Sequence, residues 1–295
     1  MIMNNLFRPR RSMLYVPGCN TRYLKKAESL RVDSVILDLG DPILIEAKEQ
    51  SRQNVVKFVQ NNNYGNRELI IRVNDFDSPW GKDDIKAIAK LNADAILFPN
   101  IESRDDVLLA IDELDKAGGK DTPIMVMIES PLAVLHAEEI ASSSDRIACM
   151  ILATSDLISQ LNARSTQERL ALISSLSMVI LAARAYKRSV VDGIHNNLID
   201  TNAFEYACRM GRDMGFDGKS LVHPDQLPYS NDAYTPKISE VDLARETIKA
   251  LAEANASGRG TVVVNNRLIE HHHANAAKRL LVLHDMITEL ENEYK

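Results

Sequence analysis

Eight short apolar runs recur along the chain and constrain its fold more than any other feature. They are rich in Val, Ile, Leu and Met, and polar segments separate them. The runs cover residues 12–16, 34–39, 68–73, 94–98, 123–128, 147–152, 189–191 and 220–222. Continuous apolar runs of this length are typical of strands that are covered on both faces, as in parallel sheets.

The segments between most of these runs carry the periodicity of helices. These patterns lie at residues 21–30, 47–60, 82–91, 104–116, 133–143, 167–185 and 202–214. A strand and a helix that alternate eight times predict an α/β fold of the (β/α)₈ TIM-barrel type. An open sheet is the alternative, because periodicity does not establish closure. The glycine patterns that bind dinucleotides or nucleoside triphosphates do not occur at the expected places.

The chain is predicted to contain a barrel over residues 1–230 and a C-terminal helical extension over residues 231–295. Within the extension, residues 228–236 read as an irregular connection and residues 258–264 as a loop with a short strand. Helices are expected at residues 238–254 and 271–293. This tail is short for a domain with its own core, so we expect a lid over the barrel or an arm that reaches another subunit.

Composition and charge exclude several classes of protein. The net charge of −6 argues against a nucleic-acid binder, which needs a basic face. Three scattered cysteines are too few for a disulfide framework or a zinc site. The N-terminal residues lack the apolar segment of a signal peptide, and no run reaches membrane-spanning length. We therefore predict a cytoplasmic protein with neither nucleic-acid nor membrane partners.

Acidic residues follow two successive apolar runs. Glu129 comes directly after the run at 123–128, and Asp156 lies shortly after the run at 147–152. The carboxyl ends of barrel strands meet at one rim, where active sites form. Either acid alone could be a helix cap or a solvated loop charge. Together they predict a Mg²⁺ site, since this ion prefers oxygen ligands and takes one or two carboxylates.

Arg72 ends the third run and would lie at the same rim. Its planar guanidinium fits a substrate carboxylate through two hydrogen bonds. A structural ion pair with Asp38 is the alternative interpretation. Other residues that follow strands are Pro17, Gly18, Asp38, Asp41, Asn74, Asn100, Asp192 and His223. The tract of three histidines at 271–273 is interpreted as a solvated helix start.

The order of several motifs resembles the citrate lyase β-subunit family, which belongs to the group of HpcH/HpaI aldolases and malyl-CoA lyases. The motifs are RRSMLYVPGCN, DSVILDLGDPILIEAKEQSR, LIIRVNDFDSPWGKDDI, LFPNIES, MIES, ATSD and GFDGKSLVHPDQL. The resemblance implies a (β/α)₈ barrel, commonly a homotrimer. It also implies cleavage or formation of a C–C bond in a 3-hydroxyacyl thioester, which is carried by CoA or by an acyl-carrier protein.

The resemblance also implies roles for individual residues. Glu129 and Asp156 would hold Mg²⁺, and Arg72 would bind the substrate. Pro17 and Gly18, together with Glu129, are the further candidates for substrate binding.

Two further residues, Asp41 and Glu270, join Arg72 as catalytic candidates. Glu270 stands where the family has an acid that protonates the enolate, often from a neighbouring subunit. The alternative is that Glu270 only interacts favourably with the N-terminal dipole of the following helix.

The sequence departs from the family pattern at four places. Gly40 replaces a glutamate, Asn100 replaces a lysine, and Glu270 replaces an aspartate. The segment Ala153-Thr154-Ser155-Asp156 stands where the family has Gly-x-Glu-Asp. Two functions are therefore kept. The first is a Mg²⁺-dependent lyase that cleaves a citramalyl-CoA, malyl-CoA or citryl thioester to a 2-oxo acid and an acetyl thioester by retro-Claisen chemistry. The second is a catalytically reduced barrel that acts as a binding or scaffold subunit.

Overall fold

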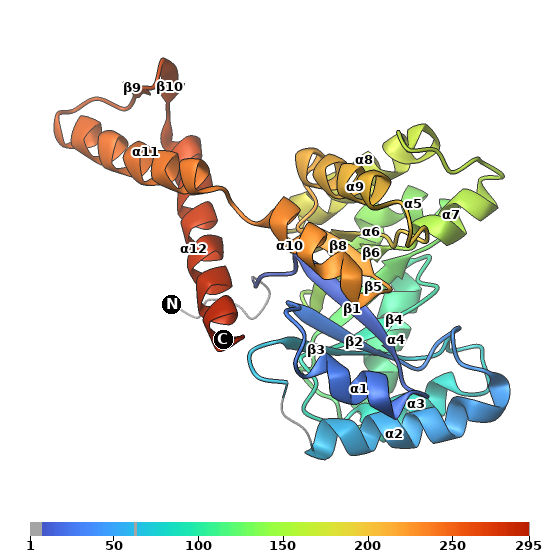
Figure 1. Cartoon of the computed structure of the whole chain (residues 1–295). Coiled ribbons are helices and arrows are strands. Elements are labelled where there is room, and N and C mark those ends of the chain that lie inside the picture. Colours follow the sequence, from blue (N-terminus) through green and yellow to red (C-terminus); the bar gives the residue numbers. More distant parts are fainter. Residues whose placement is uncertain (1–7, 62–63, 295) are drawn as a thin grey trace. The chain divides into compact units, whose positions relative to one another are not determined.

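Eight parallel strands close into a barrel in the computed structural model, which describes residues 8–61 and 64–294 (Figure 1). Each strand pairs with its neighbours in the sequence, and β8 pairs with β1 to close the barrel. The strands are β1 (Ser12–Pro17), β2 (Ser34–Asp38), β3 (Glu68–Arg72), β4 (Ala95–Phe98), β5 (Ile124–Ile128), β6 (Ile147–Leu152), β7 (Ser189–Asp192) and β8 (Gly218–Leu221). The predicted TIM-barrel fold is confirmed, and all eight apolar runs form strands.

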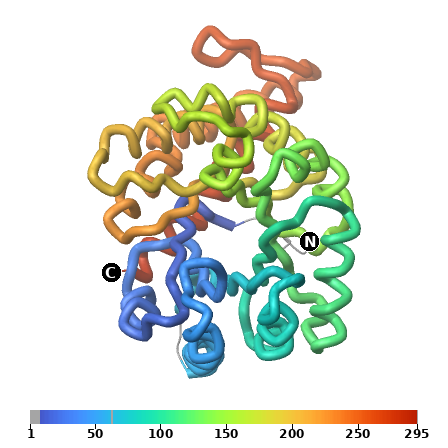
Figure 2. Tube along the Cα trace, turned by 90° about the vertical axis from the view of Figure 1, so that its right-hand side faces the viewer, coloured from blue at the N-terminus to red at the C-terminus, as the bar shows by residue number. Residues whose placement is uncertain are grey.

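Helices surround the barrel, as the view in Figure 2 shows. They are α1 (Thr21–Ala27), α2 (Lys48–Asn61), α3 (Gly81–Ile88), α4 (Arg104–Lys116), α5 (Pro131–Leu135), α6 (Ala137–Ser142), α7 (Thr154–Gln160), α8 (Ile173–Ala185), α9 (Thr201–Met214) and α10 (Leu227–Tyr234). Short 3₁₀ helices cover Ile45–Ala47, Leu170–Leu172 and Pro224–Gln226. Apart from these turns, the alternation of strand and helix follows the predicted order.

The core has two parts because successive strand residues point to opposite sides of the barrel wall. The larger cluster joins strand residues such as Leu37 to helix residues such as Val55, so it lies between strands and helices. The second cluster consists of strand residues, with Ala153 directly after a strand, and it fills the lumen. Met13, Ile36, Ile70 and Met127 are among its members. Residues two positions further along these strands therefore face the lumen at its carboxyl-end rim.

Three predictions about local structure were wrong. Residues 228–236 are not irregular, because α10 covers most of them; Pro228 lies in its first turn, where a missing N–H costs nothing. The helix expected at 133–143 is broken at His136 into α5 and α6. The helix expected from residue 167 begins at Ile173, after Arg169 adopts a left-handed conformation with φ 54°.

The residues from Thr235 onward form a second compact unit. It contains α11 (Ile238–Ala256), a hairpin of β9 (Val262–Val264) and β10 (Arg267–Ile269), and α12 (His271–Glu293). The predicted helix over residues 271–293 is confirmed. The unit has a small apolar cluster of its own, which the argument from its length did not anticipate. The boundary was expected after residue 230, inside α10, and the chain divides into its two compact units between Tyr234 and Thr235.

None of the helices within residues 8–61 and 64–294 combines the length and the apolar character that crossing a membrane requires.

Candidate active site

Arg72 and Asp38 form a buried ion pair at the carboxyl-end rim of the barrel. They are register partners at the ends of β3 and β2. Arg72 Nε donates to Asp38 Oδ1 at 2.7 Å, and Nη2 donates to Asp38 Oδ2 at 2.8 Å. The structural pairing that the sequence left open is therefore present, and it uses one edge of the guanidinium.

The other edge of the Arg72 guanidinium has no comparable partner. Nη1 lies 3.8 Å from Met127 Sδ and 3.8 Å from Asp41 Oδ2, and the Asp41 side chain is fully exposed. The ring of Tyr15 lies 5.0 Å from Arg72 Cζ and stacks as a cation–π partner. The edge formed by Nη1 and Nη2 can therefore receive a carboxylate through two hydrogen bonds while Asp38 holds the opposite edge.

The Arg72 guanidinium stays positively charged at the rim. Burial alone would lower the pKa of Arg72, but the charge and hydrogen bonds of Asp38 outweigh it and raise that pKa above its usual range. Burial raises the pKa of the Tyr15 hydroxyl as well, so the ring beneath the guanidinium stays neutral. The result is a fixed cation on a neutral aromatic support, which suits an anionic substrate group.

Glu129 follows β5 and points to the lumen side, two residues after Met127. Its Oε1 atom is buried and has no hydrogen-bond partner within the described ranges. Burial raises the pKa of this carboxyl to about 7; the Arg72 cation opposes the rise, and Asp156 and Asp41 add to it. A buried carboxylate oxygen without a partner calls for a missing ligand, and a hard cation would satisfy it.

Asp156 lies in the first turn of α7 and is exposed. It is near enough to Glu129 for its charge to raise the pKa of that residue. The capping alternative does not account for the two acids, because Ser130 caps α5 and no side chain caps α7. One buried and one exposed carboxylate at the same rim fit the ligand set of Mg²⁺.

We expect the Mg²⁺ affinity to fall as the pH is lowered below about 7. The ion needs the Glu129 carboxylate, and below its raised pKa a proton occupies that group. Affinity should drop by about tenfold per pH unit in this range, with proton release on binding. Calorimetric titration in buffers of different ionisation enthalpy measures both. An affinity that stays constant between about pH 5.5 and 7.5 would show that Glu129 is not a ligand.

Gly40 provides the space in which the Arg72 guanidinium lies. A Cβ atom at position 40 would lie 3.0 Å from Arg72 Cζ, Nε and Nη2, closer than ordinary contact. The Gly40 N–H donates to Asp38 Oδ1 at 2.8 Å, so the backbone itself supports the ion pair. The glutamate expected at this position would have to displace Arg72 from its observed place.

A Gly40→Ala variant should therefore bind 2-oxo acids several-fold more weakly, because the Arg72 guanidinium would have to move by a few tenths of an ångström from the place where it meets the carboxylate. Gly260→Ala is the matched control, since a Cβ there would meet nothing within 4 Å and the glycine has no positive φ. Titration with pyruvate and glyoxylate compares the variants. Equal affinity in Gly40→Ala and Gly260→Ala would show that Arg72 tolerates the extra methyl group.

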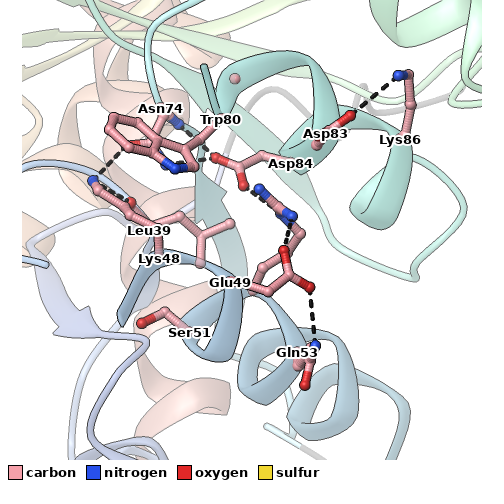
Figure 3. Close-up of polar contacts among 12 residues, drawn as sticks. Leu39, Lys48, Glu49, Ser51, Gln53, Asn74, Trp80, Asp83, Asp84 and Lys86 are labelled. Atoms are coloured by element: carbon pink, nitrogen blue, oxygen red, sulfur yellow. Dashed lines mark hydrogen bonds and ion pairs between the residues drawn. The ribbon is translucent and has the colours of Figure 1, made fainter. Parts of the chain in front are cut away.

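Lys48 holds the backbone between Asp38 and Asp41, as Figure 3 shows from its side-chain contacts. Its ammonium donates to the carbonyl oxygens of Leu39 at 3.0 Å and Gly40 at 2.8 Å, and to Asn74 Oδ1 at 2.5 Å. Burial lowers the pKa of Lys48, and the ammonium lies 5.4 Å from the Trp80 ring. Residue identity alone did not indicate this role, because a lysine at a helix start usually faces solvent.

Asp84 extends the same network to two helices (Figure 3). Its Oδ2 accepts from the Asn74 side chain at 2.7 Å, and its Oδ1 accepts from Arg52 Nε at 2.7 Å. The contacts therefore connect α2 and α3 to the rim through Lys48. The loop that carries Asp41 starts from a fixed backbone.

Pro17 and Gly18 lie beside the ion pair. Pro17 is the register partner of Asp38, and the Gly18 N–H donates to the Asp38 carbonyl oxygen at 2.9 Å. A Cβ at Gly18 would lie 2.9 Å from Val55 Cγ2, so the approach of β1 to β2 and α2 requires glycine here. The structure thus brings both candidates together with Arg72, while their contact with a substrate stays a prediction.

Other residues singled out from the sequence lie elsewhere. Asp192 directly follows Val191, whose side chain faces the lumen, so the Asp192 side chain points to the helix side of the barrel. There it forms ion pairs with Lys219 and Arg169. Asn100, by contrast, lies at the rim, because its backbone N–H donates a hydrogen bond to the Glu129 carboxyl. Its φ is 52°, and its side chain donates to Asp75 Oδ2 at 2.5 Å. Glu270 belongs to the C-terminal unit, where it is the N-cap residue of α12. Its part in the site therefore stays a prediction.

Comparison with known proteins finds relatives that extend over nearly the whole chain. A (3S)-malyl-CoA thioesterase of Cereibacter sphaeroides is 39% identical over 92% of this chain and 94% of its own. The citrate lyase β subunit of Leuconostoc mesenteroides is 32% identical over 95% of both chains. The structure of the CitE protein of Mycobacterium tuberculosis, in complex with magnesium, acetoacetate and coenzyme A, superposes with a TM-score of 0.75. It is 23% identical and covers 96% of this chain and 100% of that one, which supports the fold.

The family profile named HpcH/HpaI aldolase/citrate lyase matches residues 11–224, which span all eight strands of the barrel. The match includes every rim residue described above. This chain is therefore a member of the HpcH/HpaI aldolase/citrate lyase family.

Proposed function

We propose that the protein is a Mg²⁺-dependent C–C lyase that cleaves a 3-hydroxyacyl thioester to a 2-oxo acid and an acetyl thioester. One observation carries the proposal: an arginine, one edge of which has only long contacts with Met127 and the exposed Asp41, lies at the same rim as a buried, unpartnered carboxylate oxygen. The first binds the carboxylate of an oxo acid, and the second is a ligand for a hard cation. Bound Mg²⁺ would supply Lewis-acid stabilisation of the oxygen that becomes the carbonyl.

The residues divide the reaction as follows. The substrate hydroxyl transfers its proton to a base or to water, the bond between the hydroxyl-bearing carbon and the α-carbon of the thioester breaks, and its electron pair forms the thioester enolate. Arg72 fixes the carboxylate of the leaving oxo acid and adds positive charge close to the reacting oxygen. An acid then delivers a proton to the enolate carbon, which completes the acetyl thioester. Glu270 is the candidate for this step.

Hydrolysis of the thioester is the second candidate, and the 39% identical relative that is named a thioesterase favours it. In that reaction water attacks the thioester carbonyl and the thiol leaves, while the C–C bond stays intact. The two reactions share the carboxylate-binding arginine and the metal-binding acids. They differ only in which bond breaks.

A product assay on malyl-CoA and citramalyl-CoA separates these possibilities. A lyase releases glyoxylate or pyruvate without a free thiol, and a thioesterase releases free CoA thiol without an oxo acid. Oxo acid is measured by coupled reduction and thiol by a chromogenic disulfide. If neither product forms while oxo acids still bind, the catalytically reduced, scaffold-type barrel is the better description.

The proposal also includes the carrier of the acyl group, the number of subunits and the cellular compartment. The acyl group would be carried by CoA or by an acyl-carrier protein, and parallel assays with both carriers decide between them. We propose a cytoplasmic homotrimer in which the C-terminal unit serves as a lid or an arm. Sedimentation of the purified protein measures the subunit number.

Glu270 should show the behaviour of a proton donor if the proposal holds. Glu270→Gln is expected to lower kcat strongly and to leave substrate affinity nearly unchanged, the pattern of an interaction made only in the transition state. Glutamate and aspartate have similar intrinsic pKa values, about 4.3 and 3.9, so the longer side chain can perform the same proton transfer. A variant with the kcat of the original protein would leave Glu270 with only its N-cap position on α12.

A further inference from the structure

Three potential metal ligands converge at the start of α12, in the C-terminal unit. Glu270, His272 and His273 each offer a ligand atom, and these atoms lie within 4.8 Å of one another. His272 Nδ1 is 3.4 Å from Glu270 Oε2, and the two imidazole rings have centroids 3.8 Å apart. We propose that this cluster is a binding site for a transition-metal dication such as Zn²⁺, separate from the Mg²⁺ ligands Glu129 and Asp156.

The distances between these side chains favour a metal site over a run of histidines that bind nothing. Successive residues of a helix point about 100° apart, because a turn takes 3.6 residues. The rings of His272 and His273 nevertheless face each other with an angle of 38° between their planes. Ligands of a tetrahedral zinc ion, bound at about 2.0–2.2 Å, lie roughly 3.3–3.6 Å from each other. The separation of His272 Nδ1 and Glu270 Oε2 falls in this range.

The donor set determines which ion is expected. Two imidazoles and a carboxylate are ligands of the zinc type, whereas Mg²⁺ prefers sites made of oxygen atoms. Three protein ligands leave one position of a tetrahedron for water. The Glu270 carboxylate supplies negative charge where the positive end of the α12 dipole would otherwise oppose a cation.

One existing contact must be replaced. The Glu270 backbone N–H donates to His273 Nδ1 at 3.1 Å. A metal ion that binds His273 through this nitrogen takes the place of the peptide hydrogen. Glu270 and His273 are not fully buried, so water can satisfy the freed N–H and small side-chain rotations can close the ligand set.

The test is a calorimetric titration of Zn²⁺ into the protein at saturating Mg²⁺. We expect one ion per chain with micromolar affinity, and at least tenfold weaker binding in His272→Ala and in His273→Ala. His271→Ala is the matched control, because this neighbouring exposed histidine lies outside the cluster and should leave the affinity unchanged. Circular dichroism of each variant checks that α12 remains folded. The proposal is overturned if saturable binding is absent, if His271→Ala weakens it equally, or if His272→Ala and His273→Ala both bind as before.

A consequence for activity rests on the proposed function. If Glu270 donates the proton to the enolate, Zn²⁺ held by its carboxylate should inhibit turnover, and His272→Ala should be resistant. Zn²⁺ that binds without inhibition would support the site and count against Glu270 as the proton donor. Titration of Glu129→Ala distinguishes a failure of the Zn²⁺ site from a failure of the proposed function. This variant should lose the Mg²⁺ dependence and still bind Zn²⁺.

Discussion

The Glu129→Ala variant should lose its response to Mg²⁺ and, with it, nearly all turnover. Removal of a residue that only supports a metal ligand typically costs 10–100-fold in metal affinity. A direct ligand should cost at least about 100-fold. Asp156→Ala should behave in the same way but to a lesser degree, because its exposed carboxylate can be replaced by water more easily. Calorimetry measures the affinity, and the product assay measures turnover at increasing Mg²⁺.

The stability of the Glu129 variant separates a metal ligand from a structural residue. Because the folded-state pKa is raised from 4.5 to about 7, the apo protein loses stability as the pH rises through this interval. Glu129→Ala removes that unfavourable charge. At pH above about 7 without Mg²⁺, the variant should therefore unfold at a temperature no lower than the original protein.

Asp105→Ala provides the matched control. Like Asp156, Asp105 is exposed in the first turn of a helix that follows a barrel strand. It should leave both Mg²⁺ affinity and turnover intact. Unchanged Mg²⁺ affinity in both Glu129→Ala and Asp156→Ala would remove the metal site from this rim.

Arg72→Lys is expected to bind 2-oxo acids ten- to a hundredfold more weakly. A lysine has no second edge, so its ammonium cannot satisfy both Asp38 and a substrate carboxylate. The loss of a hydrogen bond to a charged group costs about 1.5–3 kcal/mol, which corresponds to this range of affinity. Titration with pyruvate, glyoxylate and oxaloacetate gives the measurement.

The same change should lower the free energy of unfolding, because the buried Asp38 carboxylate loses one of its two hydrogen bonds from Arg72. Arg188→Lys serves as the control for stability. Arg188 is also buried and contacts Asp145 and the Ala141 carbonyl oxygen, away from the rim. It should destabilise the protein without changing oxo-acid affinity. If Arg72→Lys binds all three acids as tightly as the original protein, Arg72 acts only as the partner of Asp38.

The barrel was predictable because its wall is covered on both faces, and this requirement produces continuous apolar runs. The prediction worked less well where burial is achieved by other means. β8 begins at Gly218, two residues before its apolar run, since Lys219 is buried through its pair with Asp192 and a Cβ at Gly218 would lie 1.8 Å from the Arg10 carbonyl oxygen. The α10 helix was missed because residues 228–236 contain Pro, Asn and Asp, which are common in irregular segments, whereas Pro228 lies in the first turn of the helix, where proline is tolerated.

The rim residues were predictable because strand ends meet at one edge of a barrel, but their contacts were not. Arg72 was interpreted either as a substrate ligand or as the partner of Asp38. One edge of the guanidinium binds Asp38 and the other edge can bind a substrate carboxylate, so the two interpretations are compatible. The order of residues in a sequence does not show which edge of a side chain contacts which partner. Lys48 was missed because its contacts are to the carbonyl oxygens of residues eight and nine positions earlier. Every residue type has a main-chain carbonyl, so the amino-acid sequence does not show which carbonyl oxygens accept a hydrogen bond from a side chain.

The contacts of Lys48 have a consequence for engineering the substrate range. The segment after β2 is an obvious target for exchange with that of a relative, since its Asp41 is exposed and lies beside Arg72. Its first two carbonyl groups, however, are held by Lys48 of α2, which in turn is held by Asn74 after β3. A chimera that exchanges residues 39–47 alone would keep Lys48 and Asn74 in positions that fit the original loop and not the new one. Grafts should therefore move the loop, Lys48 and Asn74 as one block.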